Sequence, residues 1–296
     1  MIVDGFTFFN EFELLELRLR ELSSVVDRFI LVEARETFSF RPKPLYFHEQ
    51  RERFKPYLSR IDHQVIERFP NRTSPWDAER TQREWIARAF GSEGDPDDLL
   101  VFSDLDEIPA ASALHAGLAQ DGPVSLAQRQ YYMFLNCLLV DTPILTKAKV
   151  VRRKHLPESI HDLRQLQHPA MPDAGWHFSF LGGASRAQAK MAAFAHQDLN
   201  VPSFTSQRNY ERALRAGRLH IDAKQRIREV PLDASFPAHV VENRAAYEHL
   251  IAPPGLVGNN RWDLGVLRAT HFSARVRAAL RRRFERARNK LRGAAA

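Results

Sequence analysis

The chain has 296 residues, of which 44% are hydrophobic and 27% are charged, a composition typical of a globular protein. That length suits one large α/β domain, or one domain with an appendage. The net charge of +7 is concentrated at the end, because residues 268–296 contain ten Lys or Arg and one Glu, and the rest is close to neutral. A folded domain that binds nucleic acid needs a basic face, so residues 1–267 are not expected to bind nucleic acid.

Several other classes of protein are excluded by simple features of the sequence. The single cysteine, Cys137, allows no intrachain disulfide, and no Cys/His array has the spacing of a structural zinc site. Acidic residues at positions 4, 11 and 13 interrupt the N-terminal segment, which therefore does not resemble a signal peptide. No uncharged apolar run reaches the length of a membrane span. These observations predict a cytoplasmic protein.

The first 110 residues alternate between strand and helix patterns. The predicted elements are a strand start at 2–3, a helix at 12–22, strands at 28–33 and 61–69, a helix at 76–90 and a strand at 99–103. The apolar runs at 28–33 and 99–103 are typical of buried parallel strands. The alternation predicts an α/β fold with a mainly parallel central sheet flanked by helices.

The later part of the chain is less regular. We predict a helix at 110–120, a long strand at 123–137, its neighbour at 144–151, a short strand at 175–180, and helices at 185–194 and 207–219. The long strand carries the aromatic residues Tyr131, Tyr132 and Phe134. Such residues could stack on the flat face of a ligand, although aromatic residues in a strand are more often part of a core.

The chain divides on this basis into a main α/β domain at 1–225 and a helical C-terminal extension at 226–296. Apolar residues within 272–292 recur every three or four positions among arginines, which predicts a basic amphipathic helix. Such a helix suits peripheral contact with an anionic membrane, here the inner membrane. The alternative is a helix that packs on the body by its apolar side.

The strongest chemical signal is the acidic motif that follows the strand at 99–103. Asp104 and Asp106 are two positions apart, so in extended chain both carboxylates point to the same side. Ligands of open α/β sheets bind beyond the carboxyl ends of strands. Two such carboxylates suit Mg²⁺ or Mn²⁺. A divalent ion there could neutralise the leaving diphosphate of a nucleotide-sugar.

Two alternative interpretations of this motif stay open. Three acids, Asp104, Asp106 and Glu107, could simply solvate a turn before a helix. An Asp-x-Asp motif after an apolar strand also occurs in metal-dependent phosphohydrolases with an aspartyl nucleophile. In those enzymes the motif normally lies close to the N-terminus and is soon followed by Thr or Val, whereas here Glu107-Ile108-Pro109 follows it.

Six segments together resemble glycosyltransferase family 17. They are DGFTFFNE at 4–11, LLELRL at 14–19, FILVEARETFS at 29–39, KPLYF at 43–47, SDLDEIP at 103–109 and GWHFS at 175–179. The resemblance extends from the start of the chain to about residue 220. It implies a GT-A-type nucleotide-sugar-binding fold, an inverting reaction, a divalent metal, UDP-N-acetylglucosamine as donor and a glycan or lipid-linked sugar as acceptor.

The resemblance also implies roles for individual residues. Asp104 and Asp106 match the metal-binding motif of the family, and Asp104 would also contact the donor. Glu33 and Arg35 lie where GT-A enzymes hold the base and ribose, and Arg83 would lie near the diphosphate. Glu84 stands where the family has a smaller polar residue, which weakens the assignment of Arg83.

His177 could be a third protein ligand of the metal, because GT-A enzymes often complete the site with a histidine from beyond the sheet. The alternative is a hydrogen-bonded core histidine. An inverting transfer also needs a base for the acceptor hydroxyl, and the candidates are Asp198 and Glu107. Asp198 is preferred because it follows a helix on the acceptor side. Another class of function, a non-catalytic membrane or nucleic-acid adaptor acting through the arginine-rich tail, is the remaining alternative.

Overall fold

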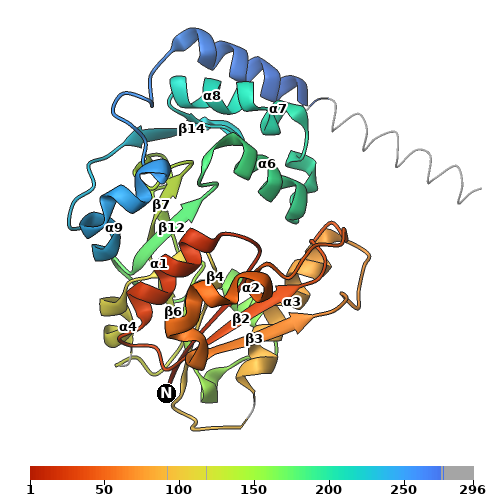
Figure 1. Cartoon of the computed structure of the whole chain (residues 1–296), viewed down its shortest axis with the longest axis vertical. Helices are drawn as coiled ribbons and strands as arrows, with labels where there is room; N and C mark the ends of the chain where they lie inside the picture. The colour runs from red at the N-terminus through yellow and green to blue at the C-terminus, as the bar shows by residue number, and fades with distance from the viewer. Residues whose placement is uncertain (92, 118, 275, 277–296) are drawn as a thin grey trace, which may run out of the picture.

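A computed structural model describes residues 1–91, 93–117, 119–274 and 276 of the chain. It contains two β-sheets (Figure 1). The strands of the first sheet are β1 (Ile2–Thr7), β2 (Arg28–Ala34), β3 (Ile61–Ile66), β4 (Leu99–Asp104), β6 (Val124–Leu126), β10 (Lys149–Arg152) and β11 (Ala170–Met171). Their order is β11-β6-β10-β4-β1-β2-β3. Strands β4, β1, β2 and β3 are parallel to one another.

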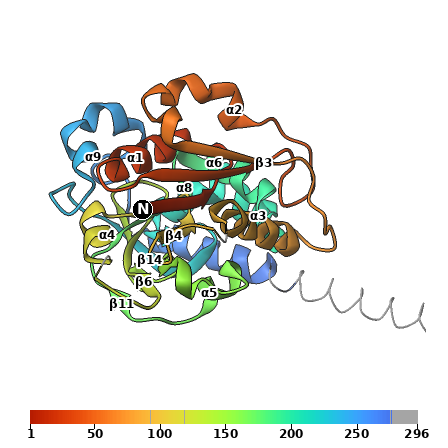
Figure 2. The same cartoon turned by 90° about the horizontal axis from the view of Figure 1, so that it is seen from below.

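Helices cover both faces of this parallel part (Figure 2). They are α1 (Phe12–Leu22), α2 (Tyr46–Gln50) and η1 (Arg51–Arg60) on one face, and α3 (Pro75–Phe90) and α5 (Ile160–Gln165) on the other. Phe6 and Leu31 pack toward α1, while their neighbours Val3 and Val32 pack toward α3. Because both faces are buried, β2 and β4 contain unbroken apolar runs at residues 29–32 and 99–102.

Helix α3, which carries Arg83, has well-defined ends. Ser74 and Asp77 form a reciprocal capping box at its start, and Pro75 occupies the first helical position. Gly91 ends the helix with a φ of 79°, a backbone conformation that favours glycine. The predicted helix at 76–90 is therefore confirmed, as is the parallel strand at 99–103.

The second sheet lies on the side of the first sheet where β4 ends. Its strands are β5 (Glu107–Pro109), β7 (Gln128–Tyr132), β8 (Cys137–Leu139), β9 (Ile144–Leu145), β12 (Gly175–Ser179), β13 (Arg218–Leu219) and β14 (Asp222–Glu229). The order is β13-β14-β8-β7-β12-β5, with β9 paired to β7. Within it, β12 and β7 are parallel and the other pairs are antiparallel.

The expectation of a mainly parallel sheet is wrong, although the α/β class is confirmed. In the first sheet β10 runs antiparallel to both β4 and β6, and most pairs of the second sheet are antiparallel. Parallel neighbours need a crossover of a dozen or more residues. After β4 the connections are mostly short, so the strands return antiparallel and both sheets are mixed.

The single long strand predicted at 123–137 is also wrong. Val124–Leu126 belongs to the first sheet and Gln128–Tyr132 to the second, with Ala127 between them. The apolar and aromatic pattern is continuous because both pieces are buried, so periodicity alone does not show that the chain changes sheets. Because the chain crosses from the first sheet to the second at Ala127, the carboxyl end of β4 lies against the second sheet.

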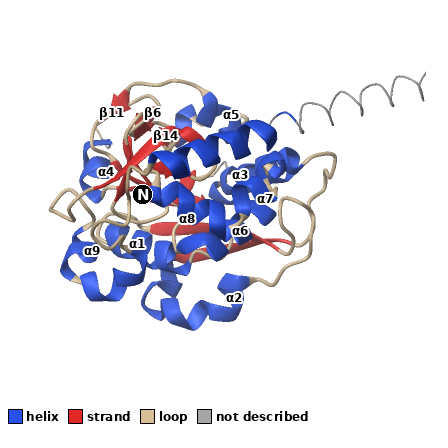
Figure 3. Cartoon of the chain, turned by 90° about the horizontal axis from the view of Figure 1, so that it is seen from above, coloured by secondary structure: helices blue, strands red, loops and turns tan. Residues whose placement is uncertain are grey.

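Helices pack on the second sheet away from the first one. They are α6 (Gly183–Ala193), α7 (Pro202–Thr205), α8 (Gln207–Arg215) and a helix at 261–274, which lie together in Figure 3. The remaining helices are α4 (Ala111–Gly117), η2 (Arg153–His155), η3 (Gln197–Leu199), α9 (Ala238–Glu242) and η4 (Arg244–Leu250). Strand β14 runs across the proposed domain boundary at residue 225.

The predicted amphipathic helix at 272–292 falls mostly outside the described residues. Within the described part of the chain, no helix is both long and apolar enough to span a membrane.

Candidate active site

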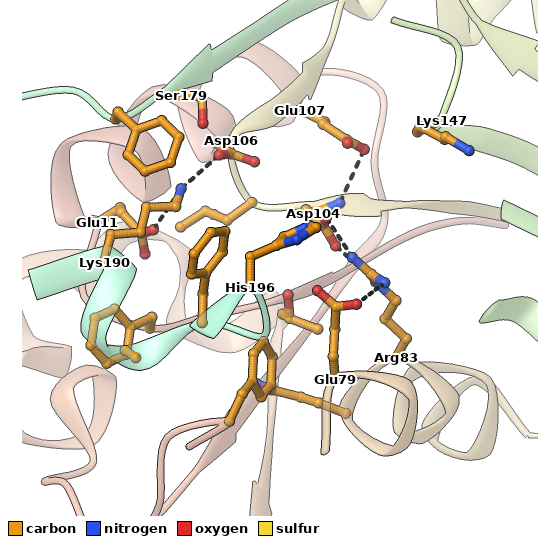
Figure 4. Close-up of a pocket in the computed structure, with 18 of the residues that line it drawn as sticks. Glu11, Glu79, Arg83, Asp104, Asp106, Glu107, Lys147, Ser179, Lys190 and His196 are labelled. Atoms are coloured by element: carbon orange, nitrogen blue, oxygen red, sulfur yellow. Dashed lines mark hydrogen bonds and ion pairs between the residues drawn. The ribbon is translucent and has the colours of Figure 1, made fainter. Parts of the chain in front are cut away.

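A cavity of about 670 Å³ opens where the carboxyl end of β4 meets the second sheet. Its walls come from α3, the turn between β4 and β5, strands β7 and β12, and α6 (Figure 4). Ligand sites of open α/β sheets lie beyond the carboxyl ends of their strands, and the volume is within the range of small-molecule pockets. The acidic and basic side chains that line it nearly balance one another.

The turn after β4 is held by Arg18 of α1, which is fully buried. Its Nη1 donates to the carbonyl oxygens of Asp104 (2.9 Å) and Glu107 (3.0 Å). Its Nε and Nη2 donate to the two carboxylate oxygens of buried Asp4, at 2.8 and 2.6 Å. Asp4 neutralises the guanidinium behind the cavity, so Arg18 positions the backbone of the acidic motif through charge-assisted hydrogen bonds.

Asp104, the last residue of β4, accepts hydrogen bonds from two arginines. Arg83 donates from Nε to Oδ1 (3.1 Å) and from Nη2 to Oδ2 (2.8 Å), and Arg164 of α5 donates to Oδ2 (2.9 Å). Burial alone would raise the pKa of this carboxyl, but the charges of Arg164 and Arg83 outweigh burial and lower the pKa to about 2. Asp104 is therefore ionised at neutral pH.

The same arginines bind two further carboxylates. Arg164 donates from Nη1 to Oε2 of Glu107 at 2.7 Å and from Nη2 to Oε1, and Glu107 is only 1% exposed. Arg83 donates to Glu79, one turn earlier on α3, at 2.8 Å. Two arginines and three carboxylates thus form one ion-pair network along a wall of the cavity.

Asp106 lies across the cavity from this network and has different partners. Lys190 of α6 donates to its Oδ2 at 2.7 Å, and Nε2 of His177 lies 3.7 Å from the same oxygen. Burial opposes ionisation, but Lys190 and His177 outweigh it, so the pKa of the Asp106 carboxyl is well below its usual range. Nδ1 of His177 lies 3.2 Å from Oε1 of Gln130, which orients the ring.

Gly175 allows strand β12 to bring His177 to this position. Its φ is +135°, and a Cβ there would lie 2.1 Å from the carbonyl oxygen of Ile108. The close approach pairs β12 with β5 so that His177 stands opposite Glu107. Only glycine permits both the backbone conformation and the contact.

The predicted metal ligands Asp104, Asp106 and His177 all line the cavity. Over the residues that the structure describes, however, no group of three or more His, Cys, Asp or Glu side chains is placed to hold a metal ion. Asp104 pairs with two arginines and Asp106 with Lys190. Because cationic side chains already neutralise both carboxylates, the donor set as arranged here does not fit a divalent ion.

Comparison with known sequences decides the family. The sequence model described as Glycosyltransferase family 17 matches residues 1–222, a range that includes every side chain of the cavity discussed above. The chain belongs to glycosyltransferase family 17. The family predicted from the sequence is confirmed, and with it the class of enzyme, a glycosyltransferase.

This family 17 chain is also similar to three mammalian proteins named β-1,4-mannosyl-glycoprotein 4-β-N-acetylglucosaminyltransferase. The proteins of Rattus norvegicus and Homo sapiens are each 30% identical to it over 116 residues, and that of Mus musculus is 29% identical. Each match covers 37% of this chain and 22% of the length of the relative. The similarity therefore concerns a limited part of those enzymes.

The predicted base candidates of the family 17 chain are placed differently from one another. Glu107 is buried and bound by Arg164, as described above. Asp198 lies in η3 with 61% of its side chain exposed, and Nδ1 of His196 is 4.0 Å from its carboxylate. Its neighbours His196 and Leu199, rather than Asp198 itself, line the cavity.

The structure does not bring Glu33 or Arg35 into the cavity. Glu33 is buried at the end of β2, where its carboxylate accepts a hydrogen bond from the backbone N–H of Phe47 (3.2 Å) and lies 3.2 Å from Nε2 of His63. Arg35 is half-exposed and pairs with Glu67 at 2.5 Å. The loop that follows them reaches the cavity instead, through residues 36–38.

Glu84, which departs from the family pattern, has a clear structural role. Its carboxylate accepts hydrogen bonds from Ser159 Oγ (2.6 Å) and from the backbone N–H groups of Ile160 (3.2 Å) and His161 (3.0 Å). These groups begin helix α5, so Glu84 ties α5 to α3. Glu84 is therefore compatible with the assignment of Arg83, since its carboxylate holds α5, the helix that carries Arg164.

The aromatic residues Tyr131 and Tyr132 of β7 and Phe134 just after it divide between core and cavity. Tyr131 is buried against Phe178 and Phe236. Tyr132 lines the cavity next to His177, and Phe134 packs against the core of the second sheet.

The sequence analysis did not identify seven charged residues of the cavity: Glu11, Glu36, Lys43, Glu79, Lys147, Arg164 and Lys190. Arg164 is 60 positions after Asp104, and Lys190 is 84 positions after Asp106, so no motif spacing connects them. One signal was available. Buried carboxylates require cationic partners, and the sequence interpretation provides the acidic motif with a metal ion alone.

Proposed function

We propose that this protein transfers a sugar from a nucleotide-sugar donor to a hydroxyl group of a glycan or lipid-linked sugar acceptor, with inversion at the anomeric carbon. The observation that carries the proposal is the position of Asp104 and Asp106. Asp104 ends the parallel strand β4 and Asp106 lies in the turn after it, on a cavity that also contains Arg83, Arg164 and Lys190. Cations at such a position suit a diphosphate. The names of the relatives support N-acetylglucosamine as the sugar, and we propose UDP-N-acetylglucosamine as the donor because the family resemblance implies it.

The strand order of the first sheet supports the proposal that the nucleotide binds at the carboxyl ends of its parallel strands. The order β3-β2-β1-β4 with helices on both faces is that of a mononucleotide-binding half, which agrees with the proposed GT-A-type fold. The loop at 36–38, on the cavity after β2, is the proposed contact for the nucleoside. Glu33 and Arg35 would then act by holding this loop, since Lys43 donates its backbone N–H to the carbonyl of Arg35 at 2.8 Å.

The proposed reaction is a single displacement. The acceptor oxygen attacks the anomeric carbon while the bond from that carbon to the diphosphate oxygen breaks, and the electron pair leaves with the diphosphate. The hydroxyl proton passes to a carboxylate, for which we propose Asp198, because it is exposed beside the cavity. Glu107, bound by Arg164 on both oxygens, suits the second role of a fixed negative charge.

Metal dependence is an expectation from the family resemblance, and the cationic partners of Asp104 and Asp106 speak against it. A divalent ion, expected to be Mn²⁺ or Mg²⁺, would supply charge neutralisation of the leaving diphosphate. Asp104, Asp106 and His177 are the residues that the resemblance assigns to it, and the two aspartates have the cationic partners described above.

The other functions considered from the sequence have less support. An aspartyl-nucleophile phosphohydrolase needs a free carboxylate, whereas both oxygens of Asp104 accept hydrogen bonds from arginines. An adaptor acting through the tail would not use the region matched by the family, which ends at residue 222. Contact of residues 272–292 with an anionic membrane, and a cytoplasmic location, stay predictions.

A ligand screen tests the proposal. The full chain is heated with UDP-N-acetylglucosamine, other nucleotide-sugars and simple phosphoesters, each with EDTA or with Mn²⁺, and the melting temperature is recorded. We expect a nucleotide-sugar to raise the melting temperature and to release its nucleoside diphosphate when a mannosyl glycopeptide is added. Phosphate release from the phosphoesters, without any response to nucleotide-sugars, would contradict the proposal.

A further inference from the structure

Lys190 stands between two carboxylates at the point where the resemblance places a metal ion. Its Nζ is 2.7 Å from Oδ2 of Asp106 and 3.3 Å from Oε1 of Glu11 (Figure 4). The three side chains come from α6, the turn after β4, and the residue just before α1. A positive charge is thus held at the acidic motif by parts of the chain that are far apart in sequence.

The position of Lys190 is well determined by its surroundings. Helix α6 is tied at its end to the loop after β2, because Phe38 N–H donates to the carbonyl of Ala193 and Ser39 Oγ donates to that of Ala192, both at 3.0 Å. The ammonium group also lies 5.8 Å from the centre of the Phe180 ring. Burial alone would lower its pKa, but Asp106 and Glu11 outweigh burial and raise the pKa above its usual range.

The ammonium group faces the cavity, where a ligand can reach it. The Lys190 side chain is 22% exposed and lines the cavity. The ammonium group of Lys149, by contrast, is not open to a ligand. Lys149 is 1% exposed and donates to Ser125 Oγ (2.9 Å) and to the carbonyl of Thr146 (2.6 Å). An ammonium has three N–H donors. Asp106 and Glu11 use two of them, which leaves one for an oxygen of a ligand in the cavity.

We propose that the ammonium group of Lys190 takes the place of the expected divalent ion and neutralises the diphosphate as it leaves the sugar. The inference rests on the proposed function. The bond from the anomeric carbon to the diphosphate oxygen breaks, its electron pair stays on that oxygen, and Lys190 donates a hydrogen bond to the diphosphate while keeping its proton. Asp106 and Glu11 hold the ammonium in position, so this donor acts as a preorganised electrostatic group.

The test compares variants of Lys190 in the full chain. Lys190→Met removes the charge and keeps the aliphatic length, and Lys190→Arg keeps the charge. Arg186→Met is the matched control, because Arg186 lies one turn earlier on α6 and pairs with Glu13 at an exposed position. UDP binding is measured by calorimetry, and UDP release from UDP-N-acetylglucosamine by a coupled assay, in EDTA and in Mn²⁺.

We expect the unsubstituted protein to bind UDP and turn over the donor in EDTA. Lys190→Met should weaken UDP binding about tenfold or more, since a hydrogen bond to a charged group is lost, and lower kcat by about 10²–10³-fold. Lys190→Arg should recover much of both, which a purely structural role would not predict, and Arg186→Met should match the unsubstituted protein.

Two results would overturn the inference, and they differ in what they leave standing. If EDTA abolishes UDP binding and turnover, and Mn²⁺ restores both equally in the Lys190→Met variant, the cation is a metal and only the inference falls. If the unsubstituted protein neither binds UDP nor turns over UDP-N-acetylglucosamine in either condition, the proposed function falls with it.

Discussion

Arg83 and Asp104 form a two-point ion pair, with Nε 3.1 Å from Oδ1 and Nη2 2.8 Å from Oδ2. The pair joins helix α3 to the end of β4, so the orientation of the Asp104 carboxylate depends on a helix that precedes the strand. Arg83 is almost buried, with 8% of its side chain exposed, and also neutralises Glu79. Its planar fork is suited to two carboxylates at once.

Replacing Arg83 by Met should reduce both stability and activity. Asp104 and Glu79 would each lose a partner in a largely buried setting, which costs about 3–5 kcal/mol of unfolding free energy. Urea unfolding measures this cost, and donor turnover measures the effect on activity. Arg80→Met is the control, because Arg80 and Asp162 pair at an exposed position and such pairs contribute about 1 kcal/mol or less. Equal unfolding free energies for the two variants would contradict the role given to Arg83.

Arg18 is predicted to be the main support of the acidic motif. It is fully buried, and its Met variant leaves Asp4 unpaired and the carbonyls of Asp104 and Glu107 without their donor. We expect a loss of about 3–5 kcal/mol in the free energy of unfolding. Arg20→Met on the exposed side of α1 should lose about 1 kcal/mol or less. A stable Arg18→Met variant with normal turnover would show that the turn does not need this arginine.

The parallel part of the fold could be predicted from the sequence because its signals are local. The apolar run ending at Asp104 marks a strand buried on both faces, and Ser74 and Gly91 mark the ends of α3. The passage of the chain from one sheet to the other at Ala127 could not be predicted. Both pieces are buried, so hydrophobic periodicity does not distinguish them, and strand pairing depends on contacts distant in sequence.

The ionisation of Asp104 predicts a pH dependence of stability. Its pKa in the folded protein is lowered to about 2 from an ordinary value of 3.8. A lowered folded pKa contributes stability that is complete above about pH 4 and is lost as the pH falls toward about 2. Urea unfolding between pH 5 and pH 2 should therefore show a steeper loss of stability in the unsubstituted protein than in Asp104→Asn. Parallel curves would contradict the ion pairs assigned to Asp104.

The choice of base predicts different effects for two carboxylates. Asp198→Asn should lower kcat by about 10²–10⁴-fold and leave the donor KM and the stability unchanged, because the side chain is exposed. Glu107→Gln should instead lower stability, because buried Arg164 loses a charged partner. Glu211→Gln, at an exposed site of α8, is the control. Normal kcat in Asp198→Asn would exclude Asp198 as the base.

The candidate site could be predicted only in part, for a related reason. Asp104, Asp106 and Arg83 belong to motifs whose order along the chain resembles the family, and the structure gathers them on one cavity with His177. Arg164 and Lys190 come from helices in later parts of the chain, and their role follows from the three-dimensional arrangement alone. Glu33 has the residue type expected of a ribose contact. Its buried carboxylate instead interacts with the backbone N–H of Phe47 and with the ring of His63.

Donor turnover in two variants, Asp104→Ala and Asp106→Ala, shows most directly whether the acidic motif serves the transfer. UDP release from UDP-N-acetylglucosamine is followed for each, and circular dichroism confirms that each variant is folded. If the acidic motif positions the groups that stabilise the leaving diphosphate, turnover should fall by about 10²-fold or more in both. Undiminished turnover in both folded variants would show that neither aspartate is needed for the transfer.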